Sequence, residues 1–501
     1  MTQRKAAILI LLATIAAYLP ALGAGFIWDD DSYLTTNPVI IQPGGFHKIW
    51  LDHTATPQYY PLVFTSFYIE HALWGLSPIG YHLVNIVLHA LNAFLVYHIL
   101  KKLGISAALA AAMVFALHPV HVESVAWITE RKNVLSALFY LASLACYLRY
   151  DSPPASSPPQ PKAYSLSLLL YLCALLCKSV TATLPAAILV ILWWQRGKLT
   201  ARDFLRMMPS FMVGIVAGLH TAWIEHHHVG TGRVDIGISG IDRVLVAGRA
   251  IWFYLGKLIW PAELIFVYPR WVIDRSQPWQ YLFPLGAIAL LISLWQLRRR
   301  IGRGPLAAAL LFGGTLVPAM GFVDVYPMRF SFVADHFQYL ASLGPIVLIT
   351  SACAQFARSR LSQLAITPIL VLLAVLTWKQ CGIYESSKRL WTDTLHKNPG
   401  AWMAQGNLAT CLFREGKIDE AIDLYKENLR LQPLAPEIHY DLARAYVYKK
   451  QVSLAIEHFQ LAIQQNPAIL KARIELAALL LAEMNPEGAI FQYQEILRTD
   501  R

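Results

Sequence analysis

The chain has 501 residues, of which 56% are hydrophobic and 15% are charged, and its mean hydropathy is +0.44. So large an apolar share excludes a soluble enzyme and predicts a multi-span membrane protein. The net charge of +11 does not indicate nucleic-acid binding, because the basic residues cluster in short breaks between apolar runs, as in cytoplasmic loops. These breaks hold Lys101 with Lys102, Arg196 with Lys198, Arg202 with Arg206, Arg298 to Arg300 with Arg303, and Arg358 with Arg360.

Eleven apolar runs are predicted to be membrane-spanning helices. The first run has no small-residue cleavage pattern after it, so we interpret it as a retained span rather than a signal peptide. With the N-terminus in the cytoplasm, this count places every basic break on the cytoplasmic side and the C-terminus outside. The predicted spans are 6–24, 79–100, 105–121, 134–150, 164–177, 180–195, 208–225, 280–297, 304–323, 337–357 and 361–378.

Two segments between these runs need a separate interpretation. Residues 244–260 are apolar but contain Arg249 and Lys257, and counting them as a span would move the basic cluster at 298–303 to the outer face. We therefore expect an interfacial or re-entrant helix there, on the outer face. Residues 152–161 contain five prolines and predict a cytoplasmic linker.

A helical repeat begins after Trp378, where the composition becomes more polar. Ala421, Ala455 and Ala489 are spaced by 34 residues, and leucine, aromatic and proline columns keep the same step. A 34-residue period with small residues where two helices cross is the tetratricopeptide signature. The predicted repeats lie near 402–435, 436–469 and 470–501, with a partial repeat before them.

These patterns predict an all-α protein with two domains. A polytopic membrane domain is expected over residues 1–380, and a tetratricopeptide-repeat α-solenoid over residues 381–501. Each repeat buries its apolar face only against its neighbours.

The first outer loop, residues 25–78, contains the acidic tripeptide Asp29, Asp30 and Asp31. Ionised carboxylates repel one another, and a nearby hydrocarbon boundary raises their cost further. Such a group is typical of a general base that acts on a lipid-borne substrate. The alternative is a solvated loop turn, because Asp also begins turns and caps helices.

Other outer loops add a carboxylate and several cations. Glu123 lies in an apolar stretch, where a buried carboxylate needs a partner. It is therefore either a catalytic residue or part of a structural ion pair. Lys178, Arg131 and Arg329 are candidates to stabilise a departing phosphate. The alternative for each cation is an interfacial anchor to lipid headgroups.

No metal or nucleotide site is expected from the sequence. The triplet His226 to His228 cannot direct all three side chains at one ion, and no Cys or carboxylate stands at ligand spacing. Glycine-rich phosphate-binding patterns are also absent from the sequence. A dependence of the activity on a divalent metal is left open.

Five short motifs, in order along the chain, resemble the transmembrane and tetratricopeptide-repeat O-mannosyltransferases and their bacterial relatives. The order of a membrane domain followed by repeats also agrees with this family. The motifs are FIWDD at 26–30, HPVHVESVAW at 118–127, ERK at 130–132, KSVTATLP at 178–185 and ADHFQYL at 334–340.

The resemblance implies a type C glycosyltransferase fold, in which the first outer loop supplies the catalytic Asp. It also implies a polyprenyl-phosphate sugar donor and transfer outside the cytoplasm. Asp29 or Asp30 inherits the base role, and we prefer Asp30 because Asp29 can instead cap the loop start.

Two positions depart from the family pattern. Asn133 stands where the family usually has an acidic residue, and His336 stands where it usually has Arg. If that Arg holds the donor phosphate, a neutral His holds it more weakly at pH 7. His336 is therefore a fourth candidate for the donor phosphate, and donor choice is open.

We expect a membrane glycosyltransferase that moves mannose or another hexose from a polyprenyl-phosphate carrier to a protein or glycan acceptor on the non-cytoplasmic face. The expected location is a bacterial inner membrane, with the repeats in the periplasm. The expected partners are the lipid-linked sugar, an acceptor held by the repeats, and membrane lipids, with no nucleic acid. The donor is the only cofactor-like molecule expected. The alternatives are a non-catalytic scaffold that recruits partners through its repeats, and a transporter, which would place its charges in mid-span.

Overall fold

A computed structural model describes residues 2–151, 160–229, 238–322, 325–356 and 366–499. The chain separates into two compact units, Met1–Ser386 and Ser387–Arg501. Every regular element in the described ranges is a helix, which confirms the all-α prediction. Most of the linker expected at 152–161, and the basic pair Arg358 and Arg360, lie outside the described residues.

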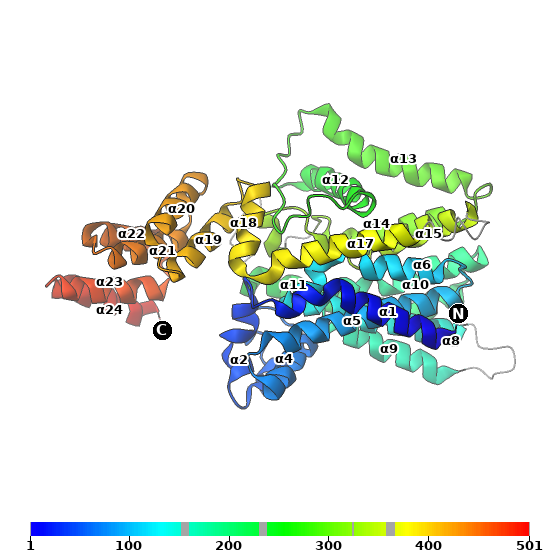
Figure 1. Ribbon diagram of the computed structural model, residues 1–501, viewed down its shortest axis with the longest axis horizontal. Coiled ribbons are helices and arrows are strands. Elements are labelled where there is room, and N and C mark those ends of the chain that lie inside the picture. The colour runs from blue at the N-terminus through cyan, green and yellow to red at the C-terminus, as the bar shows by residue number, and fades with distance from the viewer. Residues whose placement is uncertain (1, 152–159, 230–237, 323–324, 357–365, 500–501) are drawn as a thin grey trace. The chain divides into compact units, whose positions relative to one another are not determined.

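Long apolar helices build the first unit. Helix α5 packs against α1, α6 and α8, and α14 packs against α10 and α15. Figure 1 shows α1, α5, α14, α15 and α17 running along a common direction. The helices of this unit are α1 (Gln3–Tyr18), α2 (Pro38–Ile41), α3 (Gly45–Leu51), α4 (Pro61–Trp74), α5 (Pro78–Lys102), α6 (Ala108–Leu117), α7 (Val122–Ala126), α8 (Arg131–Asp151), α9 (Pro161–Leu175), α10 (Leu184–Arg196), α11 (Ala201–Ile224), α12 (Gly240–Ile259), α13 (Leu282–Leu297), α14 (Gly304–Leu316), α15 (Leu343–Phe356) and α17 (Ile366–Cys381).

Short 3₁₀ and π turns connect these helices and contain many of the charged and polar residues discussed below. They form where proline, histidine or consecutive polar residues interrupt the α-helical hydrogen bonds. The turns used below are η2 (Asp31–Thr35), η3 (Pro119–His121), η4 (Ile128–Glu130), η5 (Ser179–Thr183), η6 (Glu225–Val229), η10 (Tyr326–Arg329) and η11 (Asp335–Gln338).

Five helical segments among the described residues are long and apolar enough to cross a membrane, or six if the bent pair Ala108–Leu117 and Pro119–Ala126 forms one span. Each of the eleven predicted runs contains helix, but several are short: α10 begins at a proline step and ends at Gly197, whose φ is +79°. The count of eleven spans therefore stays a prediction. The five segments are Gln3–Gly23, Pro78–Lys102, Ala201–His227, Pro278–Leu297 and Ile366–Glu385.

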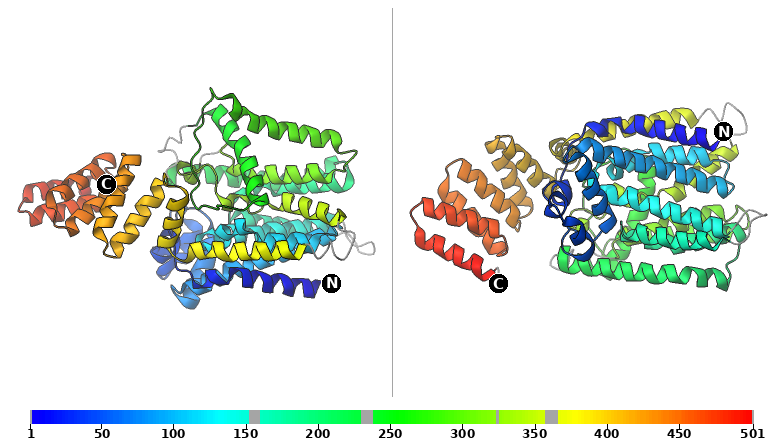
Figure 2. Two further views of the ribbon diagram at one scale, coloured as in Figure 1. Left: turned by 45° about the horizontal axis from the view of Figure 1, so that its top comes forward. Right: turned by 90° about the horizontal axis from the view of Figure 1, so that it is seen from below.

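Helix α12 coincides with the segment expected at 244–260. Its first turn is closed by a capping box in which Ser239 and Asp242 each bond the other's backbone N–H. The guanidinium of Arg249 lies 4.5 Å from the ring centroid of Trp271, so its charge is covered by an aromatic face. Figure 2 shows α12 inclined to the helices that run along the bundle. Its interfacial position stays a prediction.

Consecutive long helices of the first unit run in opposite directions, so their connections gather at two ends of the bundle (Figure 1). One end carries the acidic tripeptide, η4 and η5. The other carries the α5–α6 and α13–α14 connections with their basic residues. The basic breaks at the α5–α6 and α13–α14 connections therefore lie at the end of the bundle opposite the acidic tripeptide.

The second unit consists of stacked helical pairs with the predicted 34-residue period. Ala421, Ala455 and Ala489 are fully buried, because only a small side chain fits where the two helices of a repeat cross. Tyr425 and Phe459 fill the adjacent core. The helices are α18 (Ser387–Lys397), α19 (Trp402–Arg414), α20 (Ile418–Leu431), α21 (Pro436–Tyr448), α22 (Val452–Gln465), α23 (Leu470–Ala482) and α24 (Pro486–Thr499).

Candidate active site

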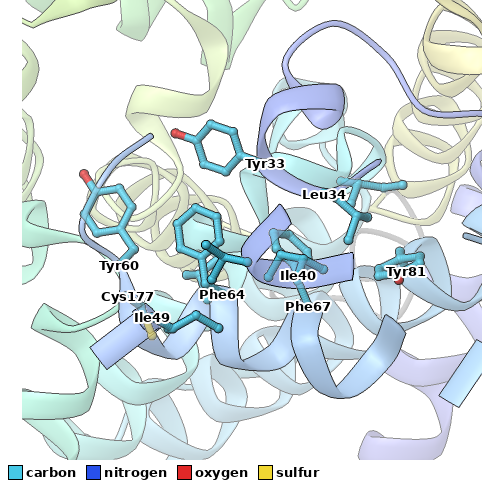
Figure 3. Packing of buried hydrophobic residues seen from close by; sticks show 12 residues of the cluster. Tyr33, Leu34, Ile40, Ile49, Tyr60, Phe64, Phe67, Tyr81 and Cys177 are labelled. Atoms are coloured by element: carbon cyan, nitrogen blue, oxygen red, sulfur yellow. The ribbon is translucent and has the colours of Figure 1, made fainter. Parts of the chain in front are cut away.

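An aromatic core holds the first outer loop in place. Tyr33 of η2 stacks on Phe64 of α4 at 5.3 Å between centroids, and Phe67 packs edge-on against Phe64. The hydroxyl of Tyr81 donates to the carbonyl of Gly75 (2.7 Å). Figure 3 shows these rings converging from the loop, α4 and α5. The acidic tripeptide therefore lies next to a packed aromatic core and is not part of a solvated turn.

Asp30 is fully buried and both of its carboxylate oxygens are engaged. Oδ2 accepts from the backbone N–H of Ile27 (2.9 Å). Oδ1 accepts from the backbone N–H of Thr129 (2.9 Å) and also from the Thr129 hydroxyl. Asp30 thus ties the first outer loop to η4, and it has little capacity left to accept a proton from a substrate.

Asp29 differs from its neighbour in one decisive respect. Its Oδ1 is covered by protein but has no hydrogen-bond partner among the described residues. Burial raises the pKa of Asp29 to about 8, against the opposing attraction of Lys132, and burial raises the pKa of Asp30 to about 7. A carboxylate with an unpaired oxygen and a raised pKa has the properties of a general base.

The backbone before Asp29 is held in an unusual conformation. Trp28 has φ +46°, which is rare for a bulky residue. Its ring stacks on Trp127 at 5.2 Å and meets Phe266 edge-on at 5.4 Å. These contacts offset the local cost, and they fix the direction in which Asp29 leaves the chain.

Glu130, the last residue of η4, forms ion pairs with two lysines. Its Oε1 lies 3.0 Å from Lys132 Nζ and its Oε2 lies 3.4 Å from Lys178 Nζ. The ammonium of Lys132 also faces the rings of Tyr33 (5.2 Å) and Trp127 (5.5 Å). Burial raises the pKa of Glu130, but the nearby His336, Lys132 and Lys178 together lower it below its usual range. Glu130 is therefore ionised, and its charge is outweighed by those of the two lysines.

A polar chain links Lys178 to Glu123. Lys178 Nζ donates to Asn133 Oδ1 (2.7 Å), and Asn133 Nδ2 donates to the carbonyl of His336 (2.9 Å). His336 Nδ1 lies 2.9 Å from Glu123 Oε1, and the His336 backbone N–H donates to Glu123 Oε2 (3.1 Å). The two positions that depart from the family pattern, Asn133 and His336, therefore touch each other.

Arg131 belongs to a different environment from its neighbours in sequence. It is fully buried and forms a two-pronged ion pair with Glu70, while Nη2 also donates to the carbonyl of Tyr81 (2.9 Å). Its Nε donates to Asn85, and Nη1 lies 3.2 Å from Ser66 Oγ. With its donors occupied by protein groups, Arg131 is placed as a structural residue that joins α8 to α4 and α5.

The remaining predicted residues lie around the cluster. Arg329 of η10 is half-buried, with its guanidinium 5.9 Å from the ring centroid of Phe330. His118 hydrogen-bonds the carbonyl of Leu258 (3.0 Å), and His121 hydrogen-bonds the carbonyl of Phe115 (2.8 Å). The two histidines of the 118–127 motif thus shape the loop and leave Glu123 to face His336.

Sequence reasoning did not single out three residues that the structure places at the site. They are Thr129, Lys132 and Glu225. The sequence pattern favours Arg131 over Lys132 as a phosphate ligand, and it gives no role to Thr129 or to Glu225, which precedes the histidine triplet. Gln58 Nε2 donates to Glu225 (2.7 Å), and Tyr33 donates to Gln58 (2.7 Å). The available signal was position: Thr129 directly precedes Glu130, and Lys132 belongs to the same motif as Glu130, ERK at 130–132.

The described residues contain no group of three or more His, Cys, Asp or Glu side chains placed to hold a metal ion. His227 instead hydrogen-bonds the carbonyl of Trp223 (2.9 Å). The chemistry that the arrangement supports is that of a carboxylate base beside a pair of fixed lysines.

Comparison with known proteins gives two findings. A family model described as "Tetratricopeptide repeat" matches residues 382–436. Protein O-mannosyl-transferase F38B6.6 of Caenorhabditis elegans is 25% identical over 85% of this chain and 63% of the relative. Protein O-mannosyl-transferase TMTC1 of Homo sapiens is 24% identical over 85% of the chain and 55% of the relative. Over a shorter stretch, tmtc2 of Xenopus laevis is 34% identical, covering 36% of the chain and 21% of the relative.

The chain thus spans less than two thirds of the length of these relatives. The long alignments nevertheless include both the membrane unit and the repeats. Together with the five motifs and the repeat match, they show that the chain is similar, along most of its length, to proteins named protein O-mannosyl-transferases.

Proposed function

We propose that this protein transfers mannose or another hexose from a polyprenyl-phosphate carrier to a hydroxyl group of a protein or glycan acceptor, on the non-cytoplasmic face of a membrane. The observation that carries the proposal is the carboxylate oxygen of Asp29 that has no hydrogen-bond partner among the described residues, near the lysine pair of Lys132 and Lys178 around Glu130. Domain assignments of 1–380 for transfer and 381–501 for acceptor recruitment belong to the same proposal.

Asp29 takes the proton of the acceptor hydroxyl. The hydroxyl oxygen then attacks the anomeric carbon, and the bond from that carbon to the phosphate oxygen breaks. The polyprenyl phosphate leaves with the bonding electrons, and Lys178 and Lys132 stabilise the charge that develops on it. Burial lowers the pKa of Lys178 to about 8, so its ammonium form still predominates at pH 7.

The remaining polar residues position these groups. Asp30 locks the first outer loop to η4 through Thr129, and Glu130 sets the separation of the two lysines. Glu123 orients His336. We therefore prefer Asp29 over Asp30 as the base, and Lys178 with Lys132 over Arg131 as the phosphate ligands.

The orientation proposal follows from the separation of charges along the bundle. The α5–α6 and α13–α14 connections, which carry basic residues, lie at the end of the bundle opposite the one where α1 ends and α5 begins (Figure 1), and basic connections favour the cytoplasmic side. A phosphatase-type reporter fused after Arg501 is expected to be active. Fluorescence of a cytoplasm-only reporter at the same position would reverse the assignment of faces.

The direct test is transfer by the purified protein in liposomes that contain a polyprenyl-phosphate mannose, followed by mass spectrometry of the acceptor. Asp29→Asn is expected to lower the rate by about 10²–10⁴, and Asp30→Asn by less. Asp52→Asn is the matched control, because Asp52 is an exposed carboxylate of the same loop. If the wild type transfers no sugar from this donor class, the proposed reaction is wrong.

A further inference from the structure

The indole N–H of Trp127 is a buried hydrogen-bond donor without an acceptor. Trp127 is 3% exposed, and its Nε1 is covered by protein atoms but has no hydrogen-bond partner among the described residues. A buried tryptophan usually pairs this N–H, because a buried donor that is left unpaired costs free energy. The reaction steps proposed above do not use Trp127, so its N–H can serve a group that the substrate brings.

The Trp127 ring is held in place from several sides. Trp28 stacks on it at 5.2 Å between centroids, Phe266 meets it at 5.2 Å and His336 at 6.0 Å, both edge-on. The carbonyl oxygen of Trp127 also accepts from the backbone N–H of Glu130 (3.1 Å). The direction of the indole N–H is therefore fixed before a substrate binds, which is what electrostatic stabilisation of developing charge requires.

The neighbours of this ring indicate which oxygen the N–H meets. Lys132 Nζ lies 5.5 Å from the Trp127 ring centroid, and Glu130 joins Lys132 to Lys178. A group that pairs with an ammonium ion and with an indole N–H at the same time needs several acceptor oxygens and a negative charge. A phosphate has both, whereas a sugar hydroxyl offers no charge to the lysines.

Trp28 is the neighbour beside which a ligand can reach the N–H. Phe266, His336 and Lys132 are only 7%, 7% and 9% exposed, whereas Trp28 is partly exposed. The Trp28 ring covers the Trp127 ring and belongs to the first outer loop. A sideways shift of this one ring uncovers the edge of Trp127 and leaves the other contacts of the indole in place.

We propose that Trp127 Nε1 donates a hydrogen bond to a non-bridging phosphate oxygen of the lipid-linked donor, which enters as the Trp28 ring moves aside. The proposal rests on the proposed function for the identity of the donor, and it adds an uncharged ligand to Lys132 and Lys178. When the bond between the anomeric carbon and the phosphate oxygen breaks, negative charge on the phosphate rises. The hydrogen bond from Trp127 then strengthens, so it stabilises the transition state more than the bound donor.

The direct test measures binding of a polyprenyl phosphate, which carries no sugar, to the purified full chain. Trp127→Phe removes the N–H but keeps an aromatic face toward Lys132. The Kd of this variant is expected to rise about 10- to 100-fold, the range for a hydrogen bond to a charged group. An unchanged Kd would overturn the proposal.

Trp74→Phe is the matched control for this substitution. Trp74 Nε1 is also covered and has no partner among the described residues, but its ring lies at the end of α4 against Tyr81 (6.0 Å), so the Kd should stay at the wild-type value. If the smaller ring of Trp127→Phe lowers the unfolding midpoint, 3-benzothienylalanine at position 127 repeats the test. It keeps the size of the indole and replaces the N–H by sulfur, and the same rise in Kd is expected.

Transfer kinetics separate the donor phosphate from other oxygens. In Trp127→Phe, kcat/KM for the polyprenyl-phosphate sugar should fall about 10- to 100-fold, while the KM for the acceptor stays within about threefold. Because an indole N–H does not titrate, the loss should be equal at pH 6 and pH 8. A loss confined to the acceptor KM, or one that changes with pH, would overturn the proposal. Weakened phosphate binding in a chain whose wild type transfers no sugar would refute the proposed function and retain the phosphate ligand.

Discussion

Substitution of Asp29 by Asn should abolish sugar transfer and at the same time stabilise the fold. The Asn side chain keeps the size of the carboxylate but cannot take the proton from the hydroxyl group of the sugar acceptor. It also removes an ionisable group that the folded protein holds in a covered position, with one oxygen lacking a partner. Loss of function and gain of stability would then come from the same buried oxygen.

The size of the stabilisation follows from the pKa of Asp29, which burial raises from 3.8 to about 8. Because the folded pKa lies above the unfolded one, the folded protein binds more protons than the unfolded chain between about pH 4 and pH 8, and stability falls as pH rises through that window. At pH 7 the upper limit of this cost is about 4 kcal/mol. Asp29 is partly exposed, so water at the site reduces the expected gain to about 1–4 kcal/mol.

The assay is the unfolding midpoint of Asp29→Asn and wild type in detergent at pH 4.5, 6 and 8, alongside turnover with the lipid-linked donor. The midpoint difference should be small at pH 4.5 and grow toward pH 8. Asp52→Asn serves again as the control and should retain wild-type turnover. Wild-type turnover in Asp29→Asn would refute the base assignment, and a midpoint difference independent of pH would refute the raised pKa.

Three further results are expected. Lys178→Ala should lower kcat/KM for the donor by about 10²-fold, with partial recovery in Lys178→Arg, because a fixed charge near the leaving phosphate is lost; a donor dependence like that of the wild type would make Lys178 a membrane anchor. Asn133→Asp should lower kcat/KM for the donor by about tenfold, because a carboxylate 2.7 Å from Lys178 would neutralise the ammonium group. Adding His336→Arg to that variant should restore kcat/KM if the charges at the two positions are coupled. Additive losses from the two substitutions would exclude that coupling. Arg131→Met should destabilise the fold by about 3–5 kcal/mol, because it leaves the Glu70 carboxylate buried and unpaired, whereas the double variant with Glu70→Leu should recover most of that loss in thermal unfolding.

The repeats and the helical class could be predicted because they depend on spacing. Ala421, Ala455 and Ala489 recur at 34 residues, and their burial follows from the helix crossing that this period imposes. The site could be predicted only in part. Arg131 and Lys132 are adjacent, both basic and both in one motif, yet successive helix residues point about 100° apart. One therefore enters the core with Glu70 and the other joins Glu130, and nothing in the local pattern says which.

The preference between Asp29 and Asp30 could not be read from the sequence for a similar reason. It depends on Thr129, which is 99 residues away from Asp30 along the chain and donates to it through both its backbone N–H and its hydroxyl.

The number of membrane spans is hard to predict from the sequence for a different reason. Proline and glycine steps shorten several apolar helices, so length and hydropathy alone identify fewer spans than the charge pattern does.

The aromatic core beneath the first outer loop determines whether the conformational entropy of that loop is lost during folding or during substrate binding. Fixing a backbone residue costs about 1–2 kcal/mol in conformational entropy, so a loop of this length that ordered only on substrate binding would draw heavily on the binding energy. Tyr33, Phe64 and Phe67 are buried by the protein side chains of their own cluster, which moves that loss into folding. Substrate affinity then reports contacts with the donor and acceptor themselves, and amide hydrogens of η2 should exchange as slowly in the free protein as in the substrate complex.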